Sequence, residues 1–424
     1  MNPRIRDRLS QDAATILLFL LLVFCIIKVW DYGRQTAGID FREKWTSGHA
    51  IPHTSAKDIY EGKYFAYRIS TPFLYSLFHW FSSDDYVRDL TVFRALCIAS
   101  SLLAILCLSR LLGYSAAAAM AAAVVFMDWF QPLLSDVRVG NVNQLQLGLL
   151  TLFVWLQSKQ KLGGRELLGG LVLGFGTMAK PNTAYVVLML CAFWIANRRF
   201  KKLIHVSLGM AIAAVIAFVV SSAAFGTVRC WVDWLRILPQ VSGYLYPVED
   251  HNYSVSMLFY EQIGIGLSGP ITLVLFAMAG VSLWFGRHRG NTPNTDATLN
   301  EDSEEPYFED MLMVAIGCLI YLLSATLVWL HYFVLTVPMA LIALRPSGNN
   351  KAAKSHAAVF SRILAAVAIV LIAELPVRAL FSATDPRHSA ALMCSGTFIL
   401  FALAVYEVLR IGKMPAGQGA HPGT

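Results

Sequence analysis

The stretch AATILLFLLLVFCIIKVWD, residues 13–31, decides the class of this protein. Its length matches the roughly 20 apolar residues that an α-helix needs to cross the hydrocarbon core of a bilayer. Arg4, Arg6 and Arg8 precede it, as they would in a signal peptide, but the apolar run reaches Trp30 and lacks a small-residue cleavage site. We therefore expect an uncleaved first transmembrane helix.

The composition of the whole chain agrees with that first helix. Of the 424 residues, 56% are hydrophobic and 14% are charged, with a mean hydropathy of +0.55, whereas a soluble domain carries about 25% charged residues. The net charge of +7 comes from short Lys/Arg clusters between apolar runs, as in cytoplasmic loops, and does not indicate a nucleic-acid-binding protein. No linker-like composition divides the chain, so we expect one membrane-embedded domain over residues 1–424.

About twelve apolar runs fit the length of a transmembrane helix, which predicts an all-α, polytopic membrane protein. Lys and Arg gather in alternate loops, so the positive-inside rule places both termini in the cytoplasm. The runs at 143–157, 166–179 and 333–345 are short, and we expect them to lengthen or to end in a protein-lined cavity. The predicted spans are 13–31, 89–109, 114–133, 143–157, 166–179, 183–197, 203–225, 262–286, 309–329, 333–345, 357–381 and 389–410.

The segments between the spans differ in character. Residues 32–88 form the first outer loop and 226–261 the second, and both contain aromatic, amphipathic stretches that suit helices lying in the membrane interface. Residues 290–310 are polar and acidic, which predicts a flexible cytoplasmic loop, and residues 411–424 are expected to be a disordered tail.

Unusual polar residues lie beside span ends that this topology places on the outer side. Ionisable groups at membrane depth are costly, so they tend to face cavities and to mark function. Five segments share that side: 38–41 with Asp40, 136–144, 180–182, 250–254 and 331–332.

Each of these segments also has a purely structural interpretation. The shared face, which depends on the predicted topology, favours the functional one. The structural alternatives are a solvated carboxylate for Asp40, an interfacial lysine for Lys180, a core histidine for His331, a loop ion pair for Asp136 with Arg138, and a helix cap for Asn252 or Ser254.

The transfer of a sugar from a lipid phosphate to an alcohol would need this set of groups. The acceptor hydroxyl must lose a proton as it attacks the anomeric carbon, and a carboxylate such as Asp40 can accept that proton as a general base. The departing phosphate needs cations at the membrane boundary, for which Lys180, Arg138 and a protonated His331 are candidates. Asn and Gln side chains can hold sugar hydroxyls, and interfacial aromatic rings can stack on the sugar.

Short motifs in a fixed order add a family resemblance over about residues 30–345. They are Gly38-Ile39-Asp40-Phe41, Ile59-Tyr60-Glu61-Gly62, Gly140-Asn141-Val142-Asn143-Gln144, Lys180-Pro181, Asn252-Tyr253-Ser254, and His331-Tyr332 with Pro338. Together they resemble glycosyltransferase family 87, whose members are membrane glycosyltransferases of the GT-C superfamily. The family includes mannosyltransferases of bacterial envelope synthesis that use polyprenyl-phosphate mannose.

The resemblance implies an inverting enzyme of GT-C fold that needs no cofactor. Asp40 matches the acidic general base of the first extracytoplasmic loop, and His331 matches a family histidine at the donor phosphate, where Lys180 and Arg138 would join it. The residues assigned to the sugar and the acceptor are Asn141, Asn143, Asn252, Ser254 and Tyr332. The family commonly has Gly-Gln before the Asn of the fourth helix, whereas this chain has Gly140-Asn141, so the sugar-recognising residues and mannose as the donor sugar stay open.

The expected partners are a polyprenyl-phosphate sugar donor, a lipid or glycan acceptor, and membrane lipids. We expect a monomer in the inner (plasma) membrane with an extracytoplasmic active site. Some GT-C enzymes bind a metal through spaced carboxylates, but Asp84 and Asp85 of the first outer loop are adjacent, so no metal is expected.

Two other classes of protein would share the helix count. A transporter or flippase for a lipid-linked glycan would carry ionisable groups at mid-membrane depth, for which Lys28 and Glu374 are the candidates. A polymerase or ligase of envelope polymers would carry an Arg-rich outer loop, but 226–261 contains only Arg229 and Arg236. The concentration of polar groups on one side favours the glycosyltransferase.

Overall fold

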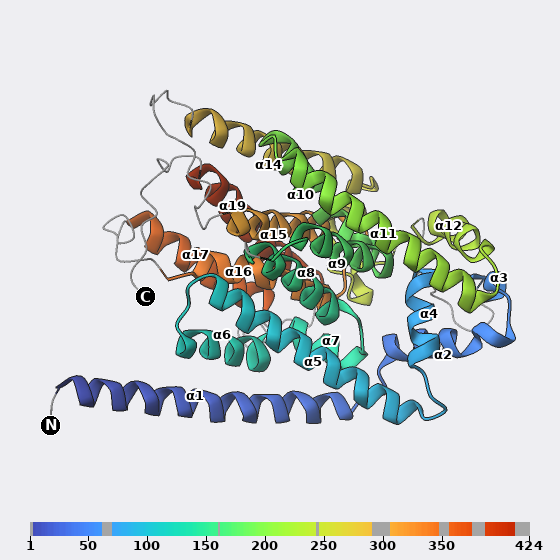
Figure 1. The fold of residues 1–424 in the computed structure, drawn as a ribbon, viewed down its shortest axis with the longest axis horizontal. Helices are drawn as coiled ribbons and strands as arrows, with labels where there is room; N and C mark the ends of the chain where they lie inside the picture. The colour runs from blue at the N-terminus through green and yellow to red at the C-terminus, as the bar shows by residue number, and fades with distance from the viewer. Residues whose placement is uncertain are drawn as a thin grey trace.

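The computed structural model describes residues 3–61, 70–159, 162–242, 246–290, 306–346, 356–374 and 386–411, and every regular element in these ranges is a helix (Figure 1). The central region of the predicted linker 290–310 and almost all of the predicted tail 411–424 lie outside the described residues. The first half of the chain forms α1 (Pro3–Arg34), α2 (Ile39–Ala50), η1 (Ile51–His53), α3 (Ala56–Tyr60), α4 (Pro72–Phe81), α5 (Tyr86–Leu111), α6 (Ala116–Trp129), α7 (Gln131–Val139), α8 (Asn143–Ser158), α9 (Arg165–Ala179) and η2 (Pro181–Thr183).

The second half continues the same pattern of long helices joined by short connections. Its elements are α10 (Ala184–Ala196), α11 (Phe200–Phe225), α12 (Arg229–Ser242), η3 (Val248–Asp250), α13 (Val255–Ile263), α14 (Ser268–Gly290), α15 (Pro306–Ser324), η4 (Leu330–Thr336), α16 (Val337–Leu344), α17 (His356–Ile372) and α19 (Pro386–Ile411).

Six of the described helices are long and apolar enough to cross a bilayer, or seven spans result if α6 and α7 count as one bent span. The prediction of about twelve spans is therefore not confirmed, although each predicted segment is helical over most of its length. Two of the missing spans are α8 and α9, which have only 16 and 15 residues, below the roughly 17–25 that a span needs. The six are α1, α5, α11, α14, α15 and α19.

The predicted span 114–133 is broken. Its two helices, α6 and α7, meet at an angle of 61°. Phe130 is extended between them, and Pro132 stands in the first turn of α7, where its missing N–H costs no helical hydrogen bond. The break turns α7 so that its last residues face the start of α8.

The helices run back and forth between two ends of the molecule. Both termini lie at one end, whereas α2, α3, α4 and α12 gather at the other (Figure 1). The most deeply buried of the six spans, α15, packs against α8, α10, α14 and α19 near the centre.

The end that holds the termini carries ion pairs between neighbouring helices. Arg199 of α11's N-cap lies 2.5 Å from Glu309 of α15, and Arg345 lies 2.9 Å from Glu407 of α19. Lys202 pairs with Asp310, whose other oxygen accepts a hydrogen bond of 2.9 Å from Trp194. The clusters of Lys and Arg in the predicted inner loops are thus partly neutralised by acidic residues of the adjoining helices.

Among the described helices, α9 and α11 share the most extensive contact, and glycines line it. A Cβ atom on Gly170 would lie 2.2 Å from the backbone oxygen of Val206, and one on Gly209 would lie 2.2 Å from that of Leu167. Small residues at this spacing let membrane helices approach closely and gain dispersion energy. The contact fixes α9, whose C-cap residue is Lys180.

We expect Gly170→Ala to lower the free energy of unfolding by about 1–3 kcal/mol, because the added methyl group must separate two backbones. Chemical unfolding in detergent micelles measures this loss. Gly280→Ala in α14 is the matched control, since no atom lies within 4 Å of the Cβ position there. Equal stability of the two variants would show that the α9–α11 contact can open at no cost.

Candidate active site at the converging helix ends

Four segments at or between helix ends meet at the start of α2. Asp40 stands in the first turn of α2, and Asn141 lies between α7 and α8. Lys180 ends α9, and His331 lies in η4, directly after α15 and its connecting loop. The four residues are separated by up to about 290 positions in the sequence, so only the packing of the helices brings their side chains together.

A buried arginine of α5 ties the first two connections to each other. The guanidinium of Arg94 donates hydrogen bonds of 3.0 Å to the backbone oxygens of Thr36, Val137 and Arg138. One side chain therefore satisfies the carbonyls at the end of α7 and at the entry to α2. This satisfies backbone groups that burial would otherwise leave without partners, and it sets the distance between Asp40 and Asn141.

Gly140 allows α2 to sit directly on the turn before α8. Its φ of +70° is in the left-handed region, and a Cβ atom there would lie 2.6 Å from the Cβ of Phe41. The Phe41 ring is fully buried among aromatic rings that include Phe78 and Phe93. Because Phe41 follows Asp40, this packing fixes the carboxylate over Asn141.

The side-chain amide of Asn141 connects the carboxylate of Asp40 to the ammonium group of Lys180. Its Nδ2 donates a hydrogen bond of 2.5 Å to Asp40 Oδ2, and its Oδ1 accepts one of 3.2 Å from Lys180 Nζ. His331 completes the group, with its Nε2 at 3.1 Å from Asn141 Nδ2 and 3.4 Å from Asp40 Oδ2. Asn141 is thus oriented by its neighbours, with its oxygen toward the cation and its nitrogen toward the carboxylate.

Asn143 repeats this arrangement on the other side of Lys180. Its Oδ1 accepts a second hydrogen bond from Lys180 Nζ, and its Nδ2 donates one of 2.8 Å to Asp136 Oδ1. The other Asp136 oxygen accepts a bond of 3.2 Å from the backbone N–H of Gln144. Asp136 therefore forms no loop ion pair with Arg138, the structural alternative that its sequence position allowed.

Lys180 keeps one N–H for a ligand. An ammonium group has three donors, and two of them are directed at the oxygens of Asn141 and Asn143. Its Nζ also lies 4.6 Å from the centroid of the Tyr332 ring, a cation–π distance. Within the described part of the chain Lys180 has no carboxylate within 4.0 Å, so its charge is balanced only through the two amides.

Asp40 has one free oxygen. Among the described residues nothing hydrogen-bonds to its Oδ1, and 28% of the side chain is exposed. Burial acts to raise the pKa of this carboxyl, but Lys44, His331, the Asn141 hydrogen bond and Lys180 outweigh burial and hold the pKa below its ordinary value. Asp40 is therefore ionised at neutral pH and can accept a proton at Oδ1.

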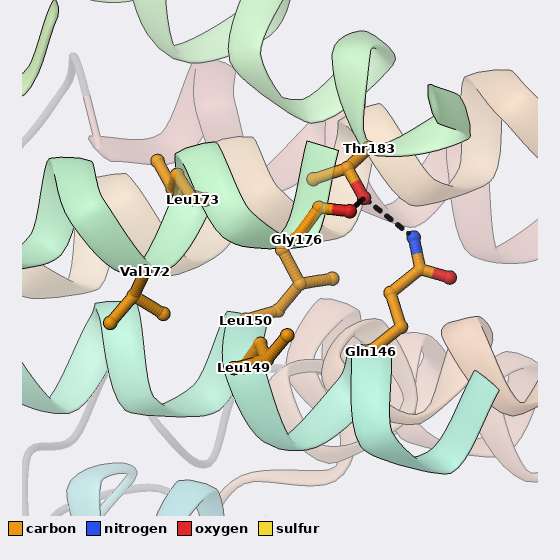
Figure 2. A pocket seen from close by; sticks show the side chains of 7 residues that line it. All are labelled: Gln146, Leu149, Leu150, Val172, Leu173, Gly176 and Thr183. Carbon is orange, nitrogen blue, oxygen red and sulfur yellow. Dashed lines mark hydrogen bonds between the residues drawn. The ribbon is translucent and has the colours of Figure 1, made fainter. Parts of the chain in front are cut away.

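Gln146 and Thr183 anchor the segment that carries Lys180. Gln146 lies one turn after Asn143 on α8, and its Nε2 donates hydrogen bonds of 2.9 Å to Thr183 Oγ1 and to Asn182 Oδ1. Figure 2 shows Gln146 reaching Thr183 at the edge of a narrow hollow between α8 and α9. The hollow is too narrow for a water molecule and is lined mainly by apolar side chains, so it does not offer a substrate site.

The structure does not bring every predicted residue to the cluster. The Arg138 side chain is exposed and forms no hydrogen bond or ion pair with a described residue. Asn252 donates bonds of 2.9 Å to the oxygens of Tyr246 and Thr326 and accepts one of 2.9 Å from Val328 N. Ser254 caps α13 and donates to the Ala325 oxygen. Asn252 and Ser254 thus hold the loop 325–329 that leads to His331.

Two residues of the cluster were not predicted as site residues. The only signal for Asp136 in the sequence is its place in the polar stretch 136–144, for which a loop ion pair with Arg138 is the structural alternative. Lys44 donates a bond of 2.9 Å to the Asp40 backbone oxygen and lies 3.5 Å from Glu43. Lys44 looks like an ordinary surface lysine in the sequence, and only the docking of α2 buries it.

We expect Gly140→Ala to destabilise the protein more than Gly226→Ala. Both glycines have a positive φ, which costs any other residue about 1–2 kcal/mol, but no atom lies within 4 Å of the Cβ position at Gly226. Gly140→Ala also forces Phe41 away, which should add about 1–3 kcal/mol. Unfolding of the two variants in micelles measures the difference, and an equal loss would mean that α2 is not seated on this turn.

Comparison with known proteins supports an enzymatic site. The model of glycosyltransferase family 87 matches residues 65–300, more than half of the chain. Asn141, Asn143 and Lys180 lie within the match, whereas Asp40 and His331 lie outside it but are in contact with those residues. No curated protein matches the chain. The family match covers two of the four converging segments, those of Asn141 and Lys180, and the chain is a membrane protein that belongs to glycosyltransferase family 87.

Proposed function

We propose that this protein moves a sugar, with mannose the first candidate, from a polyprenyl-phosphate donor to a hydroxyl of a lipid or envelope glycan, with inversion at the anomeric carbon. One observation carries the proposal: an ionised carboxylate with a free oxygen, Asp40, shares an amide with a partly buried ammonium, Lys180. A base and a cation at this spacing suit a reaction in which one oxygen loses a proton while another gains negative charge.

Asp40 acts as the general base in this scheme. The acceptor hydroxyl donates a hydrogen bond to Oδ1 and gives up its proton there as its oxygen attacks the anomeric carbon. Asn141 and His331 hold Oδ2, so the carboxylate cannot rotate away from the acceptor. A base fixed in this way lowers the entropic cost of reaching the transition state.

The cations act on the leaving group. As the bond between the anomeric carbon and the phosphate oxygen breaks, negative charge develops on the polyprenyl phosphate. The third N–H of Lys180 can donate to that phosphate in a site with little water, where electrostatic stabilisation is strong. The exposed Arg138 stands in the last turn of α7, close in sequence to Asn141, so we assign it to the same phosphate. Burial lowers the pKa of His331 to about 3, so we assign its neutral ring to the same phosphate as a hydrogen-bonding group and not as a cation.

The sugar would lie between Asp40 and Lys180. The amides of Asn141 and Asn143 hydrogen-bond to protein side chains. We therefore assign them first to orienting Lys180 and Asp40, and only second to contacting sugar hydroxyls. Tyr332 offers a ring beside Lys180 on which a sugar could stack.

The location proposed for the reaction is the outer face of the inner (plasma) membrane, with both termini in the cytoplasm. The site and the Lys/Arg-rich helix ends lie at opposite ends of the molecule. The positive-inside rule puts the Lys/Arg-rich ends in the cytoplasm, which supports a site on the outer side. A polyprenyl chain would remain in the bilayer while its phosphate reaches Lys180.

We expect Asp40→Asn to fold normally but to lower the rate of sugar transfer by roughly 10²–10⁴-fold, the usual contribution of a general base. The amide keeps an oxygen for Asn141 but cannot accept the proton. The assay gives the purified protein radiolabelled polyprenyl-phosphate mannose, other polyprenyl-phosphate sugars in parallel, and a membrane lipid extract. Asp84→Asn, at a fully exposed aspartate, is the control and should retain full activity. An active Asp40→Asn variant would remove the general-base assignment.

The dependence of transfer on pH gives a second test. Because the Asp40 pKa lies below its ordinary value of about 3.9, loss of the base form should not limit wild-type kcat/KM between about pH 5 and 8. Lys44 is one of the groups that lower this pKa, so Lys44→Met should raise it and shift the acidic fall of activity to higher pH. An acidic fall at the same pH in both proteins would assign that fall to another group.

A further inference from the structure

Asp136 is a buried carboxylate that the proposed reaction does not use directly. Its side chain has no exposed surface, it lies in α7, and it forms no ion pair with a described residue. Burying an unpaired charge is costly, so the position of Asp136 calls for a compensating cation. The nearest one along its hydrogen bonds is Lys180, on the far side of the Asn143 amide.

The geometry makes Asn143 a relay between the two charges. An amide can present either its oxygen or its NH₂ group in a given direction. Because Asp136 accepts a hydrogen bond from Nδ2, the oxygen of Asn143 must face the other way, toward Lys180 Nζ. An amide turned by 180° would direct N–H groups at an ammonium, which repels it.

Lys180 is therefore held between two similar relays. Asn141 joins it to Asp40 on one side, and Asn143 joins it to Asp136 on the other. Asp40 must gain a proton during the proposed reaction, so the carboxylate at the end of the Asn141 relay becomes neutral at that moment. Asp136, at the end of the Asn143 relay, takes no proton in this step.

We propose that Asp136 is a positioning residue that, through Asn143, keeps Lys180 charged and aimed at the phosphate of the polyprenyl donor. The inference rests on the proposed function of Lys180. It assigns to Asp136 no contact with the substrate, and it accounts for a second buried aspartate beside the site.

A purely structural role would look different in an experiment. Asp136 also accepts a hydrogen bond from the Gln144 N–H in the first turn of α8, so its loss would weaken the fold in any case. Asp310 supplies a matched control, because it is equally buried, accepts a bond from Trp194 and pairs with Lys202, but lies at the opposite end of the molecule.

The test measures binding of polyprenyl phosphate, without a sugar, to purified full-length protein in nanodiscs, together with the thermal midpoint of each variant. We expect D136N to bind at least about tenfold more weakly than the wild type, as the loss of a hydrogen bond to a charged group would give. D310N should lower the thermal midpoint but leave this affinity unchanged.

The exchange variant D136N/N143D probes the relay itself. It keeps one carboxylate, one amide and Lys180 but reverses the order of the first two, so a carboxylate replaces the amide oxygen in contact with the ammonium. We expect it to bind polyprenyl phosphate no more tightly than D136N, because a direct ion pair competes with the phosphate for Lys180. If D136N is too unstable to purify, N143A replaces it in the comparison, because it breaks the relay and keeps Asp136.

The outcomes distinguish a failure of the role of Asp136 from a failure of the proposed function. Wild-type affinity in D136N, a parallel loss of affinity in D136N and D310N, or wild-type affinity in the exchange variant would each overturn the role of Asp136. A wild-type protein that does not bind polyprenyl phosphate would instead overturn the proposed function, and the inference with it.

Discussion

The site depends on holding one ammonium group, that of Lys180, in a partly buried position without a carboxylate beside it. A direct ion pair would neutralise the cation and compete with a phosphate ligand. Two asparagine amides avoid this, because each turns its oxygen to Lys180 and its nitrogen to an aspartate. The charge is balanced at a distance, and one N–H is left for a ligand.

Much of the local structure can be understood as support for that arrangement. The bend between α6 and α7 turns Asp136 toward the start of α8, and the left-handed Gly140 lets α2 sit on the same turn. Arg94 ties the ends of α1 and α7 together, and Gln146 fixes the segment after α9. These contacts come from different helices, so the site is rigid only when all of them are packed.

Membership of glycosyltransferase family 87 gives this geometry a chemical context. The buried end of α15 and the ion pairs around it lie far from Asp40, at the end that holds the termini (Figure 1). A polar cluster confined to one end of a helical bundle fits transfer at a membrane surface better than passage through the membrane, where ionisable groups line a path. This argues against the transporter alternative, and the family match agrees.

The class of protein follows from the amino-acid sequence, because long apolar runs such as 13–31 are satisfied as helices in a bilayer. The sequence also picked out Asp40, Asn141, Asn143, Lys180, His331 and Tyr332, since polar residues beside apolar runs are rare enough to notice. The tertiary structure decided the rest. It showed that α8 and α9 are too short to span, that Asn252 and Ser254 bind a loop, and that Asp136 and Lys44 belong to the cluster. The physical reason is that hydropathy is a local property, whereas the orientation of an amide or the burial of a charge depends on partners more than a hundred residues away in the sequence.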